Sequence, residues 1–396
     1  MYDIYKINKE LDSLKMPKEF RNRIVKLDKF FNHDITVQLS IRKDAGKTTQ
    51  ALILGLVLYK LYGTTTEYIR NDKIQITKGN IETLYDVVLR FDYVKKLFKD
   101  YNTIVYKSMT KKFYLAYESE TDTGEKTIEY MSDTPLCHVS SNEEYLRLKS
   151  SYNNPNGDFL ILDECMDTQR TTSRLMIELQ NNISTITRLR STAHLLMLGN
   201  NVDQYSIWWE EFDVADKIET LQFGGYIDEV TELGTTLYIE MLSISEEQKE
   251  KIKHNHIRFS GFNTPKMSTF NGIECWQGSS HPHIPYDELL KNEPFFNLVW
   301  IKHRNKYIRL NLYHDKQFGW YVYAHFSNKP KLEDGFILTT TPMAFNETYG
   351  YGTYCYNKKA RKLLLKIWEV IKDHRIYFQS NSVGNLYTNY LRDIKE

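Results

Sequence analysis

The feature that most constrains the fold is the segment Asp34 to Gly63, DITVQLSIRKDAGKTTQALILGLVLYKLYG. Its first part, DITVQLSI, carries an apolar side chain at every second position, which is the period of a β-strand. Its last part, TQALILGLVLYKLYG, stays apolar over several helical turns and stops at a glycine, as a buried helix does. The segment therefore predicts a strand, a loop and a buried helix, in this order.

Further strands and helices follow this segment. Residues 159–162 (FLIL) and 193–198 (AHLLML) are short apolar runs, which are typical of parallel strands covered on both faces. Residues 80–101, NIETLYDVVLRFDYVKKLFKDY, have the amphipathic pattern of a surface helix. Strands that alternate with helices predict an α/β domain with a mainly parallel, doubly wound sheet.

The chain is long enough for more than one domain, since its 396 residues exceed one hydrophobic core of ordinary size. We expect the α/β domain to span residues 1–224. A helical and then turn-rich stretch begins near Gly225 and predicts a small linker domain over residues 225–284. Aromatic, strand-like segments and one late helix predict an α+β domain over residues 285–396.

Charge and cysteine spacing limit the environment of the protein. The formal net charge is +1, but residues 285–396 hold 17 Lys and Arg against 11 Asp and Glu. This basic surplus is compatible with a polyanionic partner and also with ordinary surface chemistry. The four cysteines form no CxxC pair, and no apolar run is long enough to cross a bilayer. We therefore expect an intracellular protein in a reducing compartment, without a membrane partner.

The loop before the buried helix ends in Gly-Lys-Thr, as phosphate-binding loops do. In such loops backbone N–H groups and a helix N-terminus surround the phosphates, the lysine bridges the outer phosphates, and the hydroxyl ligates Mg²⁺. Ile41 stands in place of the first glycine of the pattern, which alters the turn and removes no charge. A chance match is the alternative. The predicted nucleotide contacts are Arg42, Lys43, Asp44, Ala45, Gly46, Lys47, Thr48 and Thr49.

A second motif supports the nucleotide interpretation. Asp163 and Glu164 follow a buried strand in DFLILDE. An aspartate there can hold Mg²⁺ through water, and the adjacent glutamate can polarise the attacking water. Because open α/β sheets bind ligands at strand ends, the two motifs together predict a site for ATP and Mg²⁺.

Three further residues are candidates for the same chemistry. Asn200 follows the strand in AHLLMLGNN, where it can sense the γ-phosphate or the catalytic water, or only form a turn. Arg188 and Arg190, in TRLR, are candidates for an arginine finger that completes a neighbour's active site. Most surface arginines have no such role, and the pattern does not choose between the two.

The order and spacing of the motifs resemble those of a known family. The motifs are SIRKDAGKT, EYIRNDK, RLKSSY, LILDE and TITRLRSTAHLLMLGNN, followed by a basic, β-rich tail. The family is the DNA-encapsidation ATPases of small tailed bacteriophages with short, protein-primed genomes. The likeness covers most of the chain and is strongest over residues 35–201.

This resemblance implies an additional-strand, conserved-glutamate (ASCE) ATPase related to terminases and to the FtsK/HerA translocases. Such proteins form a pentameric ring on the portal vertex in the host cytoplasm and pack double-stranded DNA into an empty procapsid. Lys47 and Thr48 would then bind phosphate and Mg²⁺, and Asp163 would hold the metal. Glu164 would be the catalytic base, and Asn200 the sensor.

The resemblance also implies residues that act between subunits. Arg188 would be the trans-acting finger. Lys73 in EYIRNDK and Lys149 in RLKSS would be further basic residues that face a neighbour's nucleotide. Because Arg190 lies only two positions from Arg188, the finger assignment stays open between them.

Relatives in larger phages end in an RNase H-like nuclease, which needs several acids converging on two metals. The strand-like segments FFNLVWIKH and YIRLNLY contain no Asp or Glu. We therefore expect residues 285–396 to form a vestigial nuclease-like domain that contacts DNA or the portal. The alternatives are a complete terminase with an active nuclease, a cellular HerA-like translocase and a non-catalytic DNA-binding adaptor.

Overall fold

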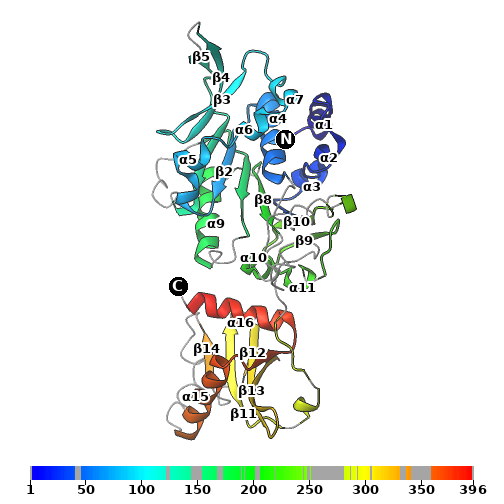
Figure 1. Cartoon of the computed structure of the whole chain (residues 1–396), viewed down its shortest axis with the longest axis vertical. Helices are drawn as coiled ribbons and strands as arrows, with labels where there is room; N and C mark the ends of the chain where they lie inside the picture. The colour runs from blue at the N-terminus through cyan, green and yellow to red at the C-terminus, as the bar shows by residue number, and fades with distance from the viewer. Residues whose placement is uncertain are drawn as a thin grey trace. The chain divides into compact units, whose positions relative to one another are not determined.

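The structure is a computed structural model that divides into two compact units, residues 1–277 and 278–396. Figure 1 shows the elements of both units, coloured along the chain. The structure describes residues 2–394 apart from 41–45, 122–124, 144–153, 167–172, 189, 191, 201–205, 219, 244, 248–249, 251–280, 286, 292, 304–305, 331–335 and 340–357.

The described residues of the first unit form both helices and strands. Its helices are α1 (Ile4–Ser13), α2 (Lys18–Arg21), α3 (Leu27–Asn32), α4 (Lys47–Tyr62), η1 (Lys73–Ile76), α5 (Lys78–Ile81), α6 (Asp86–Leu89), α7 (Asp92–Lys95), α9 (Ser173–Thr187), α10 (Ile207–Glu211) and α11 (Ala215–Ile218). Its strands are β1 (Ile35–Ser40), β2 (Thr66–Arg70), β3 (Thr103–Lys107), β4 (Lys112–Glu120), β5 (Lys126–Met131), β6 (Cys137–Ser141), β7 (Phe159–Asp163), β8 (His194–Asn200), β9 (Tyr226–Val230) and β10 (Thr236–Met241).

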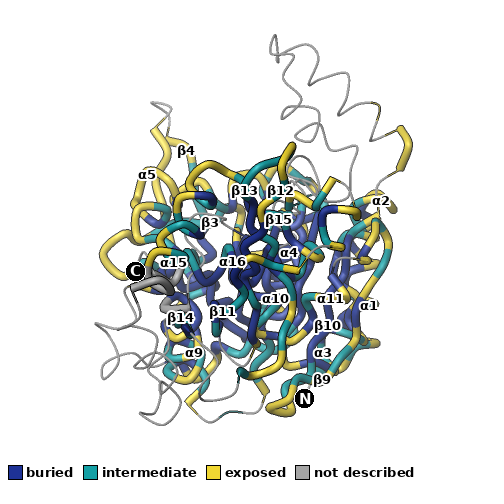
Figure 2. The backbone as a smooth tube through the Cα atoms, turned by 90° about the horizontal axis from the view of Figure 1, so that it is seen from below, coloured by how far each residue is buried: buried dark blue, intermediate teal, exposed yellow. Residues whose placement is uncertain are grey.

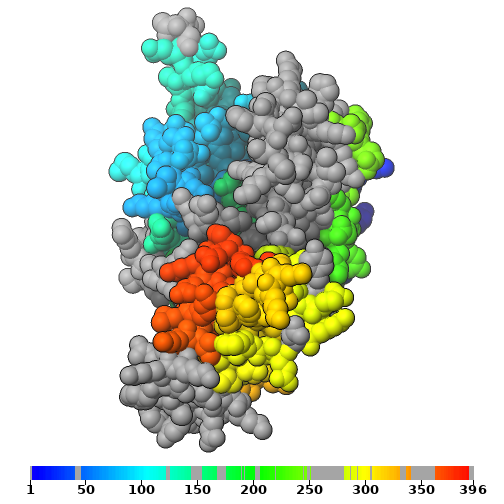
Figure 3. Space-filling view, turned by 60° about the horizontal axis from the view of Figure 1, so that its bottom comes forward, coloured from blue at the N-terminus to red at the C-terminus, as the bar shows by residue number. Residues whose placement is uncertain are grey.

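These ten strands form one sheet. Neighbouring strands follow the order β3-β4-β6-β2-β7-β8-β1-β10-β9, and β5 pairs with β4 in a hairpin that projects from the unit (Figure 1, Figure 3). The strands β6, β2, β7, β8, β1 and β10 are parallel, so their carboxyl ends meet at one edge of the sheet. The predicted α/β class with a mainly parallel sheet is confirmed.

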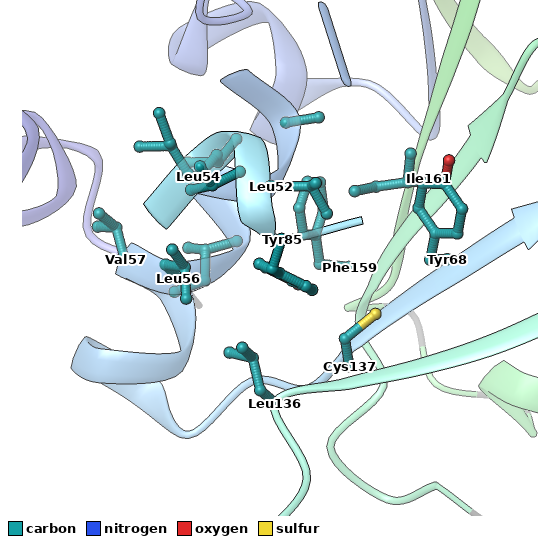
Figure 4. Packing of buried hydrophobic residues seen from close by; sticks show 14 of the residues in the cluster. Leu52, Leu54, Leu56, Val57, Tyr68, Tyr85, Leu136, Cys137, Phe159 and Ile161 are labelled. Carbon is teal, nitrogen blue, oxygen red and sulfur yellow. The ribbon is translucent and has the colours of Figure 1, made fainter. Parts of the chain in front are cut away.

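Helix α4 covers one face of this sheet. Every residue from Gln50 to Leu58 is buried, which explains why the segment is apolar all round. Its leucines pack against Tyr68, Phe159 and neighbouring residues of the strands (Figure 4). The helix lies so close to β2 that a Cβ on Gly55 would stand 2.5 Å from Thr66 Oγ1.

The other face of the sheet carries a second apolar cluster, contributed by β-strand residues and by helices α9, α10 and α11. Strand β7 shows why its sequence is continuously apolar. Phe159 and Ile161 belong to the cluster of α4, whereas Leu160 and Leu162 belong to the second cluster. Side chains alternate between the faces of a strand, so a strand covered on both faces needs apolar residues throughout.

Two predictions on the first unit differ from the structure. The single helix predicted over residues 80–101 is wrong, since the segment folds into short helices that include α5, α6 and α7. Phe91, with φ −91° and ψ 117°, is extended and separates α6 from α7. The domain boundary expected after residue 224 falls inside the first unit, because β10 pairs with β1 and β9 pairs with β10.

The second unit is an α+β fold with its own core. Its elements are η2 (Asp287–Leu290), β11 (Phe296–His303), β12 (Lys306–Asp315), β13 (Gly319–Ser327), β14 (Phe336–Thr339), α15 (Lys358–Lys372), β15 (Ile376–Phe378) and α16 (Asn381–Ile394). The five strands follow the order β14-β11-β12-β13-β15, with β11, β12 and β13 antiparallel. Buried residues of α15 and α16 belong to the same apolar cluster as residues of the strands. Figure 2 colours the backbone by burial. The RNase H-like assignment of this unit stays a prediction.

Within the described residues, no helix combines the length and apolar character that a bilayer span requires.

Candidate nucleotide-binding site

The carboxyl edge of the parallel strands brings several of the predicted site residues together. Gly46 has φ 65° and is the N-cap of α4, so the helix starts directly after a left-handed turn that glycine adopts without strain. Lys47 is the first helical residue and is buried. Its Nζ donates to Ser40 Oγ at the end of β1 and, at 3.1 Å, to Asn200 Oδ1 at the end of β8.

Burial also changes the charge state of this lysine. Removal from water lowers the pKa of Lys47 to about 8, although the carboxylate of Asp163 acts in the opposite direction. A buried ammonium with few compensating negative charges is costly, and a phosphate group would supply those charges. The position and the burial of the Lys47 ammonium therefore suit the binding of an anion at the N-terminus of α4.

Thr48 and Asp163 form the next pair. Thr48 Oγ1 donates to both carboxylate oxygens of Asp163, at 3.1 Å and 3.0 Å. Asp163 also accepts from the hydroxyl of Tyr68 at 2.6 Å, and its exposed fraction is only 3%. A threonine hydroxyl beside a buried carboxylate suits Mg²⁺, which takes one or two carboxylates together with phosphate oxygens and water.

Glu164 adopts an uncommon backbone conformation at this edge. Its φ is 57°, in the left-handed region that residues with a Cβ rarely occupy. Its N–H donates to Asp163 Oδ1 at 3.0 Å, and its side chain is 56% exposed. The carboxylate thus points away from the core, where substrate and water can reach it.

Arg70, the last residue of β2, contacts both acidic residues. Its guanidinium lies 3.1 Å from Asp163 Oδ2 and 2.5 Å from Glu164 Oε2, and its Nε donates to Tyr68 OH at 2.9 Å. Burial disfavours the charge of Arg70, but the carboxylate of Asp163, with Tyr68 and Glu164, raises its pKa above the ordinary value. The guanidinium of Arg70 is therefore ion-paired with the carboxylate of Glu164.

Comparison with known proteins adds information on the fold. No protein-family model and no curated protein matches the sequence. Among solved structures, the Phi-28 gp11 DNA packaging motor is similar over 95% of this chain and 99% of its own, with TM-score 0.59 and 14% identity. A chain of the bacteriophage Phi-29 viral genome packaging motor assembly is similar over 94% and 99%, with TM-score 0.53 and 14% identity. The chain has the fold of a phage DNA-packaging motor.

Within this packaging-motor fold, the two candidate finger arginines have different surroundings. Arg190 is held inside its own chain, since its Nε donates to Asp158 at 2.8 Å and its NH2 donates to the backbone oxygen of Ile186 at 3.1 Å. Arg188 is exposed, directly after α9, with φ 42°. Of the two, Arg188 is the more exposed, and its assignment as the finger stays a prediction.

The remaining predicted residues divide into two groups. Thr49 is half-buried in the first turn of α4, and Lys73 is exposed at the start of η1, shortly after β2. The structure therefore places Thr49 two positions after Lys47 on α4 and Lys73 on the surface. The predictions for Arg42, Lys43, Asp44, Ala45 and Lys149 lie outside the described residues.

Sequence reasoning missed Arg70, Tyr68 and Ser40. A charged residue ends the buried strand TEYIR at Arg70 as Asp163 ends FLILD, but the sequence of TEYIR is not apolar and gives no sign of that burial. Nothing in the sequence says that these two strands are neighbours, which is what gives the arginine its partners.

The second unit was expected to lack a nuclease metal site. Over the described part of the chain, no group of three or more His, Cys, Asp or Glu residues could hold a metal ion. Asp315 accepts from the backbone N–H groups of Phe318 and Gln317, each at 2.7 Å, and these hydrogen bonds lower its pKa. This acid therefore closes the turn between β12 and β13.

Proposed function

We propose that the protein is an ATP-hydrolysing motor that moves viral double-stranded DNA into a preformed procapsid. The observation that carries the proposal is the convergence of Lys47, Thr48, Asp163 and Asn200 at one sheet edge of a packaging-motor fold. In this proposal the subunits form a ring, a pentamer as in the family the sequence resembles, at the portal vertex in the host cytoplasm. Residues 285–396 contact the DNA or the portal.

Each residue has a role that follows from its position. Lys47 and the N-terminus of α4 bind the phosphates, and Asn200, which shares a hydrogen bond with Lys47, senses the γ-phosphate. Mg²⁺, held by Thr48, Asp163 and phosphate oxygens, would neutralise charge on the transferred phosphoryl group. Glu164 orients the attacking water once Arg70 releases its carboxylate.

The finger acts between subunits because it is too far from the site of its own chain. Arg188 precedes β8, whereas Asn200 is the last residue of that strand. A strand of this length spans about 20 Å, and Arg190, two positions after Arg188, donates to Asp158 directly before β7, which places this segment at the amino edge of the sheet. In a ring, the same arginine can reach a neighbour's nucleotide and link hydrolysis in one subunit to the position of the next.

Glu164→Gln tests the proposed chemistry. The amide keeps the shape of the side chain but cannot act as a base, so we expect ATP hydrolysis to fall by about 100-fold or more while ATP still binds. The measurement is steady-state phosphate release, with fluorescent nucleotide binding as a control for the intact site. Near-normal turnover by Glu164→Gln would rule out this assignment.

A further inference from the structure

We infer that three buried asparagines, Asn71, Asn142 and Asn182, form a hydrogen-bonded chain that positions Glu164 and connects it to helix α9. Asn71 Nδ2 donates to the backbone oxygen of Glu164 at 3.4 Å, and Asn71 Oδ1 accepts from Asn142 Nδ2 at 3.1 Å. Asn182 Nδ2 donates to the side-chain and backbone oxygens of Asn142, at 2.8 Å and 3.2 Å. The inference rests on the proposed function, since it concerns the proposed catalytic base.

All three side chains are shielded from water, with exposed fractions of 5% for Asn71, 0% for Asn142 and 1% for Asn182. Every hydrogen bond runs in the same direction, because each amide uses its NH₂ group as donor and the amides of Asn71 and Asn142 also accept. Buried hydrogen bonds in such a series polarise one another. A buried amide that lost its hydrogen-bond partner could not bond to water instead, and leaving it unsatisfied would cost free energy. Each asparagine therefore fixes the position of the next.

The topology explains how these residues meet. Asn71 directly follows β2 and Asn142 directly follows β6, and the last residues of these parallel neighbours, Arg70 and Ser141, are paired in register. Glu164 directly follows β7, the other neighbour of β2. The chain therefore runs along the carboxyl edge of the sheet and ends on α9, whose residue Asn182 belongs to the middle of the helix.

The backbone of Glu164 needs such support. A left-handed φ of 57° is unfavourable for a glutamate and persists only where its surroundings hold it. Asp163 Oδ1 accepts from its N–H, and Asn71 donates to its carbonyl oxygen, so both polar groups of its backbone are held. Asn71 touches no substrate and acts as a positioning residue. It fixes the point from which the Glu164 carboxylate reaches the attacking water.

The series of asparagines also connects the proposed catalytic base, Glu164, with the proposed finger, Arg188. Helix α9 ends at Thr187, and Arg188 follows it directly. A movement of the finger that displaces α9 would change the support of Glu164 through Asn182. The asparagine chain is thus a physical connection between the base that serves one nucleotide and the arginine offered to the next.

The test compares Asn71→Ala and Asn182→Ala with Asn154→Ala in the full chain. Asn154 is the matched control, because it is also a buried asparagine and is 5% exposed. Its side chain donates to Glu67 and makes no hydrogen bond to Asn71, Asn142 or Asn182. We expect Asn71→Ala to lower kcat for ATP hydrolysis about tenfold or more, with KM unchanged within about twofold. Asn154→Ala should lower the thermal unfolding midpoint without this fall in kcat. Adding Asn182→Ala to Asn71→Ala should lower kcat little further, because both substitutions interrupt the same series of hydrogen bonds.

A second readout does not depend on activity. Hydrogen exchange over residues 163–166 should be faster in Asn182→Ala than in wild type, although the change is on another element, and unchanged in Asn154→Ala. Wild-type kcat in Asn71→Ala or unchanged exchange in Asn182→Ala would overturn this inference alone. A wild-type chain that neither binds nor hydrolyses ATP would overturn the proposed function, and the inference with it. If Asn71→Ala does not fold, Asn71→Ser replaces it, with the same expected fall in kcat.

Discussion

Lys47 shows how a single residue links binding to stability. Its amine is buried, hydrogen-bonded to Ser40 and Asn200, and has its pKa lowered to about 8 by that burial. The folded chain without nucleotide therefore holds a charge that would be better solvated in the unfolded chain. The proposed phosphate binding would offset this cost, since it would bring negative charge to the ammonium.

The pKa of Lys47 leads to a prediction on stability. In the unfolded chain the amine has its ordinary pKa near 10.4, so between about pH 8 and pH 10 the unfolded state binds more protons. Across this window the wild type therefore becomes more stable relative to Lys47→Met as the pH rises. We expect the wild type to gain on the order of 2 kcal/mol relative to Lys47→Met between pH 7.5 and pH 10. Urea unfolding of both proteins measures it, and a difference independent of pH would contradict the prediction.

Arg70 neutralises two acids whose charges would otherwise repel each other. Removing it in Arg70→Ala leaves Asp163 buried without its cation, and we expect a loss of about 3 kcal/mol in the free energy of unfolding. Adding Asp163→Asn to Arg70→Ala should recover much of this loss, because the uncompensated charge is gone. Denaturant titration of the single and double variants measures both effects, and simple additivity of the two changes would count against the account.

Residues that a motif of fixed spacing indicated do lie together in the structure. Glycine, lysine and threonine must be consecutive to surround a phosphate, so Lys47 and Thr48 were visible in the sequence, and the acidic end of a buried strand indicated Asp163. The contacts of Arg70 and of the three asparagines depend on which strands are neighbours, and the sequence does not state the strand order. Asn71 and Asn142 are 71 positions apart and meet because β2 and β6 are neighbours.

At the scale of elements, β10 completes the sheet beside the phosphate-binding strand. Leu237 to Met241 pair with Ile35 to Leu39 of β1, and β10 is almost entirely buried. The linker was predicted from the helical and turn-rich sequence that begins near Gly225 and includes this strand. Local pattern alone could not reveal that this strand returns to β1, since the two are separated by most of the first unit.

The position of β10 predicts where the first unit can be shortened. A fragment of residues 1–224 lacks β9 and β10, so β1 would become an exposed edge with unpaired backbone groups and an open core. We expect this fragment to aggregate or to unfold without a cooperative transition, whereas residues 1–243 unfold cooperatively. Circular dichroism during urea titration distinguishes them. Equal midpoints for both fragments would show that β10 is dispensable.

At the scale of the whole molecule, the first unit separates two functions on opposite edges of one sheet. Lys47, Asp163 and Asn200 lie at the carboxyl edge, and Arg188 precedes β8 at the amino edge. In the proposed mechanism, a subunit built this way does not supply the finger to its own nucleotide. We therefore propose that hydrolysis requires an assembled ring, in which every site is shared by two neighbouring chains.

The most direct test of this shared-site motor is DNA-stimulated ATP hydrolysis by mixed subunits. Arg188→Ala lacks the finger and Glu164→Gln lacks the base, so each protein alone should be nearly inactive with double-stranded DNA. In an equal mixture, the Arg188 of a Glu164→Gln subunit can complete the site of an Arg188→Ala neighbour. The account predicts that the mixture recovers a measurable part of the wild-type, DNA-stimulated rate. A mixture as inactive as its two components, at concentrations where wild type is active, would contradict it.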